Sequence, residues 1–566
     1  MKRRTYKDPI KKRKRLRAAI IAAAIIAIAV CAAIACFFII KREGPATSGS
    51  YYLASTSGDA EVYIYDDYEK RLFLTHSDLK RGDEVISKDE TYTENGRDYV
   101  VVSAGDQTYY VNEKRLVKSL DDIVQETEKY VRTPVTVYKE KDSAEINSYI
   151  PKGSHVNISG YDKLLDDGNV NMYKIESDGI TGWVYGKYLV DGQKEAEAVN
   201  EEIYDIHKER AYGSDLYGGS ASNLDWYAYE KPSFEGNTLL DDARVMYLCN
   251  KSYANIDEYL ALAKKYGINA VCMDIKDKLL CCQFDTAAEI SPTSNENYSY
   301  SQEYMEQVVQ KIKDAGLYLI CRIVVFRDTY YAEDHPEECI VSDQSTSVWP
   351  SAYSRNVWYY NVELALEVIE RFSPNEIQFD YVRFPEEAYK MSTADDTDFR
   401  NTYNEDKCQA IQNFLFYACD TIHQKGVYVS ADVFAECANK YVSAYGQYFP
   451  AISNIVDVIS AMPYTDHFGT SEDTWSDPYT TVYDWAKRAA QRQAEIETPA
   501  LARTWLTCYS VPFWNPVTDC DSDYFSKEAQ ALYDAGLTGG FLSWNSASGM
   551  DTYTAVGSAW GYDYTK

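Results

Sequence analysis

The chain has 566 residues and a formal net charge of −30 at pH 7. Its first 17 residues carry ten Lys or Arg and one Asp, a charge of +9, which leaves −39 on the remaining residues. A protein this acidic repels polyanions over long range, which excludes nucleic acid as a partner and favours neutral or cationic ligands.

An uncharged stretch over residues 18–40 follows the basic segment. At about 1.5 Å per residue, a helix of this length crosses a hydrocarbon core of about 30 Å. A cleaved signal peptide is the alternative, but its apolar part would span only about 7–15 residues. Because a basic flank stays in the cytoplasm, we expect a single-pass cell-membrane protein with a cytoplasmic tail over residues 1–17 and extracellular domains after Lys41.

Two segments that follow a Gly/Ser/Thr-rich linker (residues 41–50) share one pattern of short alternating strands. They cover residues 51–120 and 130–190, and Arg81-Gly82 in the first corresponds to Lys152-Gly153 in the second. Alternating runs separated by Gly or Asp turns are typical of short β-strands. The repeat predicts two small all-β modules, separate from the large domain that follows.

The second module ends in a Gly-Trp-Val…Tyr-Leu pattern over Gly182–Leu189. In this it resembles bacterial SH3-like domains, whereas the first module has Tyr109-Tyr110 in place of Gly-Trp. The resemblance implies binding of cell-wall peptide or glycan. A spacer without a ligand is the alternative.

Strand and helix patterns alternate through residues 243–566, after a polar, Tyr-rich linker or lead-in over residues 191–242. Apolar runs predict strands at Arg244–Leu248, Ala270–Asp274, Leu317–Phe326, Glu376–Arg383, Val427–Phe434, Val456–Met462, Leu501–Cys508 and Gly540–Trp544. Amphipathic stretches between them predict helices, several of which end at a glycine: Gly267, Gly316, Gly426 and Gly536. The pattern predicts an α/β fold, a (β/α)8 TIM barrel. An open doubly wound sheet is the alternative, but it would carry a glycine-rich phosphate turn.

Three acidic residues, Asp274, Asp380 and Asp432, lie at or near the ends of predicted strands. The carboxyl ends of barrel strands face the active-site mouth, so these residues are catalytic candidates. A lone charge within a barrel is costly, and we therefore expect Arg322 and Lys276 to pair with Asp274 and Asp380. A purely structural network of charges is the alternative.

Cleavage of a glycosidic bond uses one ionised and one protonated carboxyl group. Asp380, with Arg383 and Arg322 expected nearby, suits the ionised role. Asp432 is flanked by apolar residues, which favours a raised pKa and the role of the acid. Asp274 can replace either of them.

The segment Glu376–Pro385 (EIQFDYVRFP) is the most specific motif of the chain. Together with Asn269–Asp277, Ile320–Asp328 and Ser430–Phe434 it makes residues 244–554 similar to a bacterial family of glycoside hydrolase-like barrels. The resemblance implies a glycosidase-like activity on a sugar polymer. Residues of its motifs then become candidates for substrate binding: Arg383, Arg322, Lys276, Tyr464, His467, Trp505, Trp544 and Asn545.

One departure from this family concerns the seventh strand, which in the family continues Trp-Leu-Gln-Asp. This chain has Trp505-Leu506-Thr507-Cys508 instead. If the Gln and Asp of the family contact sugar, the substrate differs here or the activity is impaired.

The motifs of other hydrolases are missing from the sequence. The chain has six His and neither an HExxH nor a GxSxG motif, so we expect no metal, no cofactor and no catalytic serine. We predict a membrane-anchored extracytoplasmic glycoside hydrolase that acts on a cell-envelope or extracellular polysaccharide, such as peptidoglycan, through a carboxylate pair. The alternative is a non-catalytic barrel that binds glycan or cell wall as a scaffold.

Overall fold

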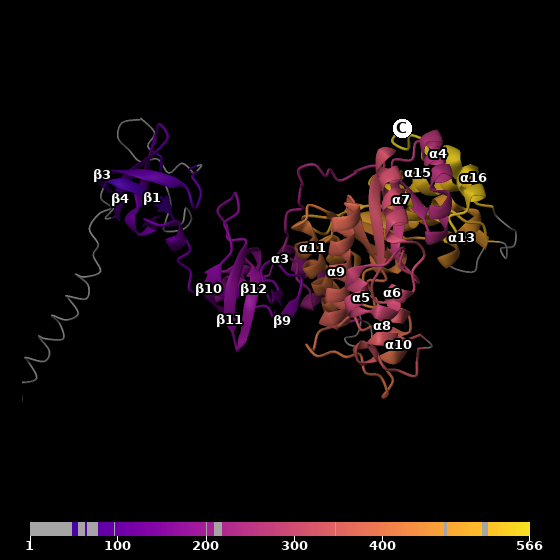
Figure 1. Cartoon of the computed structure of the whole chain (residues 1–566), viewed down its shortest axis with the longest axis horizontal. Coiled ribbons are helices and arrows are strands. Elements are labelled where there is room, and N and C mark those ends of the chain that lie inside the picture. Colours follow the sequence, from indigo (N-terminus) through magenta and orange to yellow (C-terminus); the bar gives the residue numbers. More distant parts are fainter. Residues whose placement is uncertain are drawn as a thin grey trace, which may run out of the picture. The chain divides into compact units, whose positions relative to one another are not determined.

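The computed structural model describes residues 48–54, 63–64, 77, 79–94, 97–199, 201–208, 218–345, 347–468, 472–511 and 519–566. Figure 1 shows the chain, which divides into two compact units. One holds the described parts of residues 1–127 with residues 161–171, and the other holds residues 128–160 and the described parts of 172–566. The predicted tail (1–17) and membrane span (18–40) lie outside the described residues. Within the described part of the chain, no helix is long and apolar enough to cross a membrane.

The first unit contains an antiparallel six-stranded sheet with the order β2-β5-β4-β3-β1-β6. Valine side chains of β3, β4 and β5 and Leu53 of β1 form its core. β1 begins at Gly49, inside the predicted linker. The strands are β1 (Gly49–Leu53), β2 (Tyr63–Ile64), β3 (Glu84–Glu94), β4 (Arg97–Ala104), β5 (Gln107–Asn112) and β6 (Leu116–Val117).

A second all-β sheet has the order β13-β7-β10-β11-β12-β8-β9. We call it the second β module. Its strands are β7 (Glu128–Val131), β8 (Val135–Tyr138), β9 (Ile146–Ile150), β10 (His155–Tyr161), β11 (Met172–Ser177), β12 (Ile180–Tyr185) and β13 (Leu189–Val190).

The large domain is built on a parallel sheet with the order β20-β19-β18-β17-β16-β15-β14-β22-β21. The first strand pairs with the last, and β20 and β21 are two parts of one strand path interrupted at Arg503, whose N–H donates to the Ile459 carbonyl at 3.0 Å. The sheet therefore forms a nearly closed barrel of the TIM type, which confirms the predicted parallel α/β barrel. Its strands are β14 (Ala243–Leu248), β15 (Ala270–Lys276), β16 (Tyr318–Val324), β17 (Glu376–Asp380), β18 (Tyr428–Phe434), β19 (Val458–Met462), β20 (Leu501–Ala502), β21 (Thr504–Thr507) and β22 (Gly540–Trp544).

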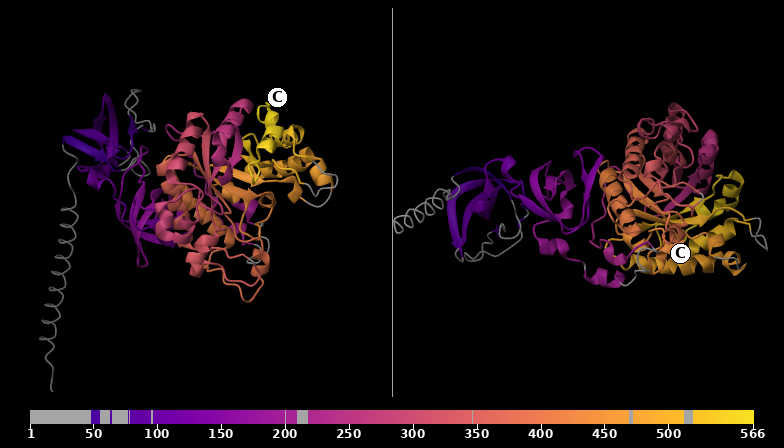
Figure 2. Two further views of the ribbon diagram at one scale, coloured as in Figure 1. Left: turned by 45° about the vertical axis from the view of Figure 1, so that its right-hand side comes forward. Right: turned by 90° about the horizontal axis from the view of Figure 1, so that it is seen from below.

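Helices cover the outside of this barrel (Figures 1 and 2). Every residue of β15, β16 and β17 is buried, because a strand of a parallel barrel is covered on both faces. The helices are α4 (Ile256–Tyr266), α5 (Asp285–Ile290), α6 (Pro292–Glu296), α7 (Gln302–Asp314), α8 (Thr329–Asp334), α9 (Arg355–Phe372), α10 (Ala388–Met391), α11 (Lys407–His423), α12 (Phe449–Ser453), α13 (Glu472–Ser476), α14 (Pro478–Gln493), α15 (Ser522–Asp534) and α16 (Met550–Trp560).

The predicted helix ends at Gly267, Gly316, Gly426 and Gly536 are confirmed. All four glycines have φ between 70° and 88°, the left-handed region that ends a helix without steric cost. The largest difference at a predicted strand end concerns the fourth strand. β17 ends at Asp380 rather than Arg383, because Tyr381 turns into the left-handed region at φ 54°.

The segment predicted as a linker or lead-in packs against the barrel. It contains α2 (Gln193–Glu197) and α3 (Glu201–His207), and its Trp226 lies in a core with Cys408 and Tyr448 of the barrel domain. The His207 ring stacks on Trp226 with centroids 3.9 Å apart. The segment is therefore a lead-in fixed to the barrel and not a free linker.

The second β module also packs against the barrel, through α11. The Asp420 carboxylate accepts a hydrogen bond of 2.7 Å from the Tyr188 hydroxyl and pairs with Lys187 at 2.5 Å. The hydroxyl of Tyr185 donates to the Asp420 carbonyl at 3.2 Å. The module thus keeps a sheet of its own, apart from the barrel sheet, while its tyrosines take polar groups of α11 as partners.

Replacing Asp420 by Ala should lower the free energy of unfolding by about 1.5–3 kcal/mol, the range for hydrogen bonds to a charged group. The full-length protein in detergent, unfolded by denaturant, provides the measurement. Asp257 pairs with Lys311 at the surface, where its side chain is 75% exposed. The control Asp257→Ala should therefore cost at most about 1 kcal/mol. Equal losses in the two variants would contradict a structural role for this contact.

Candidate active site

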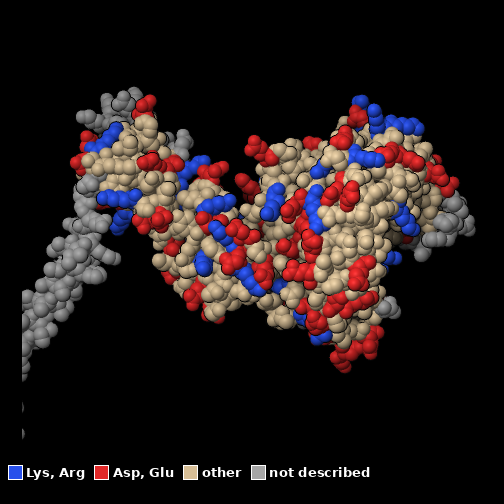
Figure 3. Space-filling model, in the orientation of Figure 1, with Lys and Arg blue, Asp and Glu red and all other residues tan. Residues whose placement is uncertain are grey.

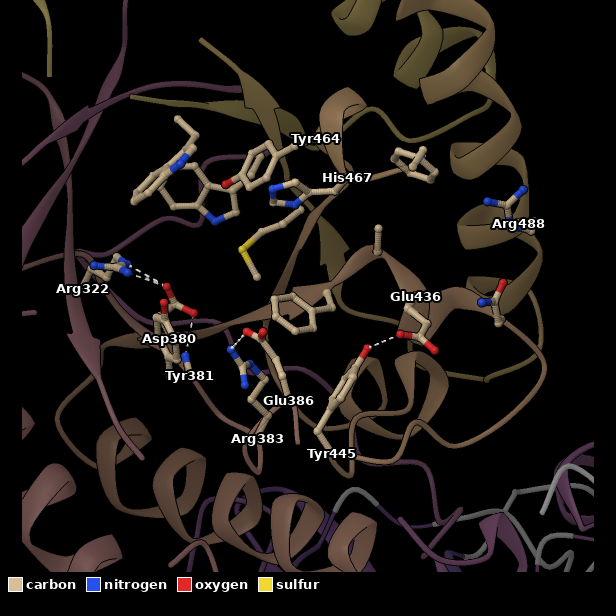
Figure 4. A pocket seen from close by; sticks show the side chains of 17 residues that line it. Arg322, Asp380, Tyr381, Arg383, Glu386, Glu436, Tyr445, Tyr464, His467 and Arg488 are labelled. Carbon is tan, nitrogen blue, oxygen red and sulfur yellow. Dashed lines mark hydrogen bonds and ion pairs between the residues drawn. The ribbon is translucent and has the colours of Figure 1, made fainter. Parts of the chain in front are cut away.

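A cavity of about 850 Å³ opens at the carboxyl ends of the barrel strands. Its lining comes from the ends of β16, β17, β18, β19, β21 and β22 and from the segments that follow them. Figure 4 shows these side chains around the open space. Of the predicted site residues, seven line this cavity: Asp380, Arg322, Arg383, Tyr464, His467, Trp505 and Trp544.

Arg322 of β16 is the centre of the predicted charge cluster. Its guanidinium donates to Asp274 of β15 at 2.6 Å and to Asp380 of β17 at 2.5 and 3.2 Å, and it lies 3.7 Å from Asp432 of β18. All four side chains are at most 10% exposed. One cation therefore holds the acids of three neighbouring strands together.

One arginine cannot neutralise three carboxylates, so some of them hold a proton. Burial raises the pKa of Asp274 to about 6, although Arg322 opposes this. Burial and the neighbouring Asp380 raise the pKa of Asp432 well above its usual range. Burial opposes the charge of Arg322, but Asp274 and Asp380 outweigh it and hold the pKa of Arg322 above its usual value. The cluster favours a charged Arg322 with a protonated Asp432.

Asp380 is the member of the cluster that reaches the cavity. Arg322 holds its Oδ2, and the backbone N–H of Tyr381 donates to its Oδ1 at 2.5 Å. This second bond accompanies the left-handed backbone at Tyr381, a conformation that costs about 1–3 kcal/mol in a residue other than glycine. Both oxygens of Asp380 are thus fixed by donors, as in a preorganised site.

Asp432 and Asp274 lie behind this surface and do not line the cavity. The Trp505 indole donates to Asp432 Oδ1 at 2.7 Å, and Asp432 Oδ2 has no hydrogen-bond partner among the described residues. The Tyr247 hydroxyl donates to Asp274. Each of the two acids therefore holds an aromatic side chain as well as facing Arg322.

Aromatic rings form one wall of the cavity. Trp505 and Trp544 meet edge to face with centroids 5.5 Å apart, and Tyr464 lies 6.4 Å from Trp544 in a stacked orientation. Flat aromatic faces of this kind can pack against the apolar faces of sugar rings.

Two of the predicted pairings are wrong. Lys276 binds Asp328 at 2.6 Å and Asn361 at 2.8 Å, because the register of β15 against β16 shifts between Asp274 and Lys276. An irregularity of this kind redirects the next side chain. Arg383 donates to Glu386 at 2.9 Å, and no hydrogen bond or ion pair joins it to Asp380 among the described residues.

Asn545, a predicted sugar ligand, is not among the residues that line the cavity. Its amide donates to the Cys508 carbonyl at 2.8 Å, and its carbonyl accepts from the N–H groups of Ala547 and Gly549. Asn545 thus joins the end of the seventh strand to the start of α16.

Six polar residues that line the cavity were not predicted from the sequence: Tyr381, Glu386, Glu436, Asn439, Tyr445 and Arg488. Tyr381 lies within the motif Glu376–Pro385, Glu386 follows that motif directly, and Glu436 follows β18 by two residues. A search for acids just beyond each predicted strand would have found both glutamates. Arg488 lies on α14, and no sequence signal marks it.

The seventh strand departs from the family motif at residues that are buried away from the cavity. Thr507 and Cys508 have no exposed surface, and the Thr507 N–H donates to Glu528 at 2.9 Å. Among the described residues, no group of three or more His, Cys, Asp or Glu side chains is arranged to hold a metal ion.

Several solved structures match part of this chain at low similarity. A hypothetical protein from Ruminiclostridium thermocellum ATCC 27405 is 27% identical over 33% of this chain and 97% of its own, with a TM-score of 0.28. An endo-1,4-beta-mannanase from Rhizomucor miehei is 12% identical over 59% and 97%, with a TM-score of 0.38. A chitobiase from Flavobacterium johnsoniae is 10% identical over 58% and 48%, with a TM-score of 0.39.

No curated protein sequence matches the chain. A family profile described as "putative glycosyl hydrolase domain" matches residues 245–549. This stretch is more than half of the chain and contains most of the first barrel strand, all of the later ones and the cavity. The chain belongs to this glycosyl hydrolase domain family.

Proposed function

We propose that the protein is a glycoside hydrolase in which Asp380 is the reacting carboxylate. One observation carries the proposal: Asp380 lines the cavity while donors from Arg322 and the Tyr381 backbone fix both of its oxygens. Two sets of donors hold a carboxylate in one orientation. Such a group serves either as a nucleophile at the sugar carbon C1 or as the base that activates water.

Glu386 is the second carboxyl group of this mechanism. It lines the same cavity and lies on the same side of it as Asp380 (Figure 4). Arg383 fixes its position, while its side chain is 66% exposed and can exchange protons with water. In the reaction the C1–O bond breaks and its electron pair stays on the leaving oxygen, which takes a proton from Glu386. In one route Asp380 removes a proton from water, whose oxygen bonds to C1. In the other, Asp380 bonds to C1, and water then displaces it from C1 while Glu386 takes the proton of that water.

Asp432 and Asp274, the acids first expected in that role, act as positioning residues in this proposal. Asp432 holds the Trp505 indole at the cavity wall, and Asp274 holds the far side of Arg322. Neither lines the cavity, so neither can reach a glycosidic oxygen.

A neutral polysaccharide outside the cytoplasmic membrane is the substrate class that we propose. The family membership and the aromatic wall support a carbohydrate. Figure 3 shows acidic side chains spread over the displayed face of the barrel, which disfavours a polyanion. The basic and apolar sequence at the start of the chain supports anchoring in the membrane, and an SH3-like role of the β modules would place the site at the cell envelope.

A barrel that binds glycan without cleaving it is the second candidate. Its support is the Thr507-Cys508 pair, which stands where the family motif has Gln-Asp; the burial of both residues away from the cavity limits this support. Binding of an oligosaccharide without turnover by the wild-type protein would support this candidate.

Two substitutions should separate the roles of the cavity carboxyls in full-length protein assayed in detergent. Asp380→Asn keeps the shape and removes the charge, so it should lower kcat/KM about a hundredfold or more on every substrate. Glu386→Gln should lower kcat/KM by a similar factor on unactivated oligosaccharides. It should lower kcat/KM less on 2,4-dinitrophenyl glycosides, because their leaving group departs without a proton.

Asp484→Asn serves as the control, because Asp484 is exposed on α14 and does not line the cavity. It should leave the rates unchanged. An active preparation that tolerates Asp380→Asn would assign Asp380 to structure and refute the mechanism.

The raised pKa of Asp274 predicts a pH-dependent stability. Because the folded protein binds this proton more tightly than the unfolded chain, Asp274 stabilises the fold below about pH 4 and loses this contribution as pH rises to about 6. Two pKa units correspond to about 3 kcal/mol. The free energy of unfolding, measured with denaturant between pH 4 and 7, should therefore fall less steeply with rising pH in Asp274→Asn than in the wild type. Parallel curves would contradict the assignment.

The proposed topology predicts that protease added to intact cells releases the region after residue 41. A tag at the N-terminus should stay protected until the cells are lysed, because the positively charged flank stays in the cytoplasm. Immunoblots of the two compartments provide the measurement. A protected barrel together with an exposed N-terminal tag would reverse the topology.

A further inference from the structure

We propose that the cavity contains a second sugar-binding position, the distal subsite, formed by Glu436, Asn439 and Arg488. Its ligand is the hydroxyl groups of a further sugar ring, so that the enzyme takes oligosaccharides or polysaccharides in preference to single glycosides. This inference rests on the proposed function and deepens it.

The distal subsite lies away from the proposed reacting carboxylate. Figure 4 shows Asp380 and Arg322 on one side of the cavity, and Glu436 and Arg488 on the other. Glu436 belongs to the short helix η9 (Ala435–Ala438) after β18, and Arg488 belongs to α14. A cavity of about 850 Å³ is at the upper end of the range for drug-sized ligands, about 300–1,000 Å³, which leaves room for more than one sugar ring.

Glu436 is held as an acceptor by neutral partners. The hydroxyls of Tyr441 and Tyr445 donate to its two oxygens at 2.8 and 2.9 Å, and the Asn439 amide donates to Tyr441 at 3.1 Å. These contacts fix the carboxylate without neutralising it. An ionised carboxylate offers about four acceptor positions, so about two remain for a ligand.

Arg488 supplies the complementary donors. The other two arginines of the cavity are engaged, Arg322 by Asp274 and Asp380 and Arg383 by Glu386. The Arg488 side chain makes no hydrogen bond or ion pair with any described residue. A guanidinium has five N–H donors, all of which remain available to a ligand here.

The two charges together select hydroxyl groups over an ionised substituent. A sugar hydroxyl both donates and accepts, so neighbouring hydroxyls on one ring can use Glu436 and Arg488 at once. The negative charge of Glu436 would repel an acidic substituent on the sugar, and the positive charge of Arg488 would repel an amino sugar. Phe468, which also lines the cavity, offers a face for the C–H groups of the ring.

Binding by an inactive variant tests this proposal without interference from turnover. Calorimetry on full-length Asp380→Asn protein in detergent would use β-1,4-linked di-, tetra- and hexasaccharides of glucose, mannose and N-acetylglucosamine. For at least one of these sugars we expect the tetrasaccharide to bind more tightly than the disaccharide. Adding Arg488→Ala or Glu436→Ala should reduce that advantage by about tenfold, the scale of one lost hydrogen bond to a charged group.

Lys487→Ala is the matched control, because it removes the same charge from the next residue of α14 and Lys487 does not line the cavity. It should leave the length dependence unchanged. Equal affinity for oligosaccharides of all lengths would overturn the distal subsite while the proposed function stands. The same holds if Lys487→Ala reduces the affinity advantage of the tetrasaccharide as much as Arg488→Ala does. A wild-type protein that neither binds nor cleaves any of these sugars would refute the proposed function, and the distal subsite with it.

Discussion

The burial of one guanidinium among three carboxylates governs the architecture of the candidate site. Arg322 ties the ends of β15, β16 and β17 together and faces Asp432 on β18. Removing one partner from such a buried cluster leaves an uncompensated charge, which is far more costly than loss of a surface pair. The cluster therefore sets the position of Asp380, the protonation of Asp432 and, through Asp432, the orientation of Trp505.

Strand phase and residue type were enough to predict the barrel and the centre of its site. Alternation within each apolar run placed Asp274, Arg322, Asp380 and Asp432 on converging strand ends, and the structure brings all four within reach of one guanidinium. The alternation of side chains along a strand predicts which of them share a face, but it does not predict where the register between two strands shifts. The irregularity after Asp274 and the left-handed turn at Tyr381 therefore hid the true partners of Lys276 and Arg383.

Other errors arose where a few apolar residues lie in a polar stretch. The lead-in before the barrel carries acidic and tyrosine-rich sequence, and its anchoring depends on Trp226 and His207, which give no periodic signal. The contact of the second β module with α11 gave no signal either, since it combines tyrosine hydroxyls on Asp420 with tyrosine rings on Phe416 and Tyr417. Polar contacts between segments far apart in sequence leave no pattern in either segment.

That contact has a kinetic consequence. Tyr188 and its partner Asp420 are 232 residues apart, so the second β module precedes α11 by a large part of the chain during synthesis. Its tyrosines cannot find their partners until four strands of the barrel, β14 to β17, and then α11 have followed. Contacts of such high sequence separation are slow to form, and their apolar surroundings stay exposed meanwhile. The second β module therefore waits for its partners during synthesis, and the pairing of β14 with β22, which closes the barrel over a still longer separation, comes later.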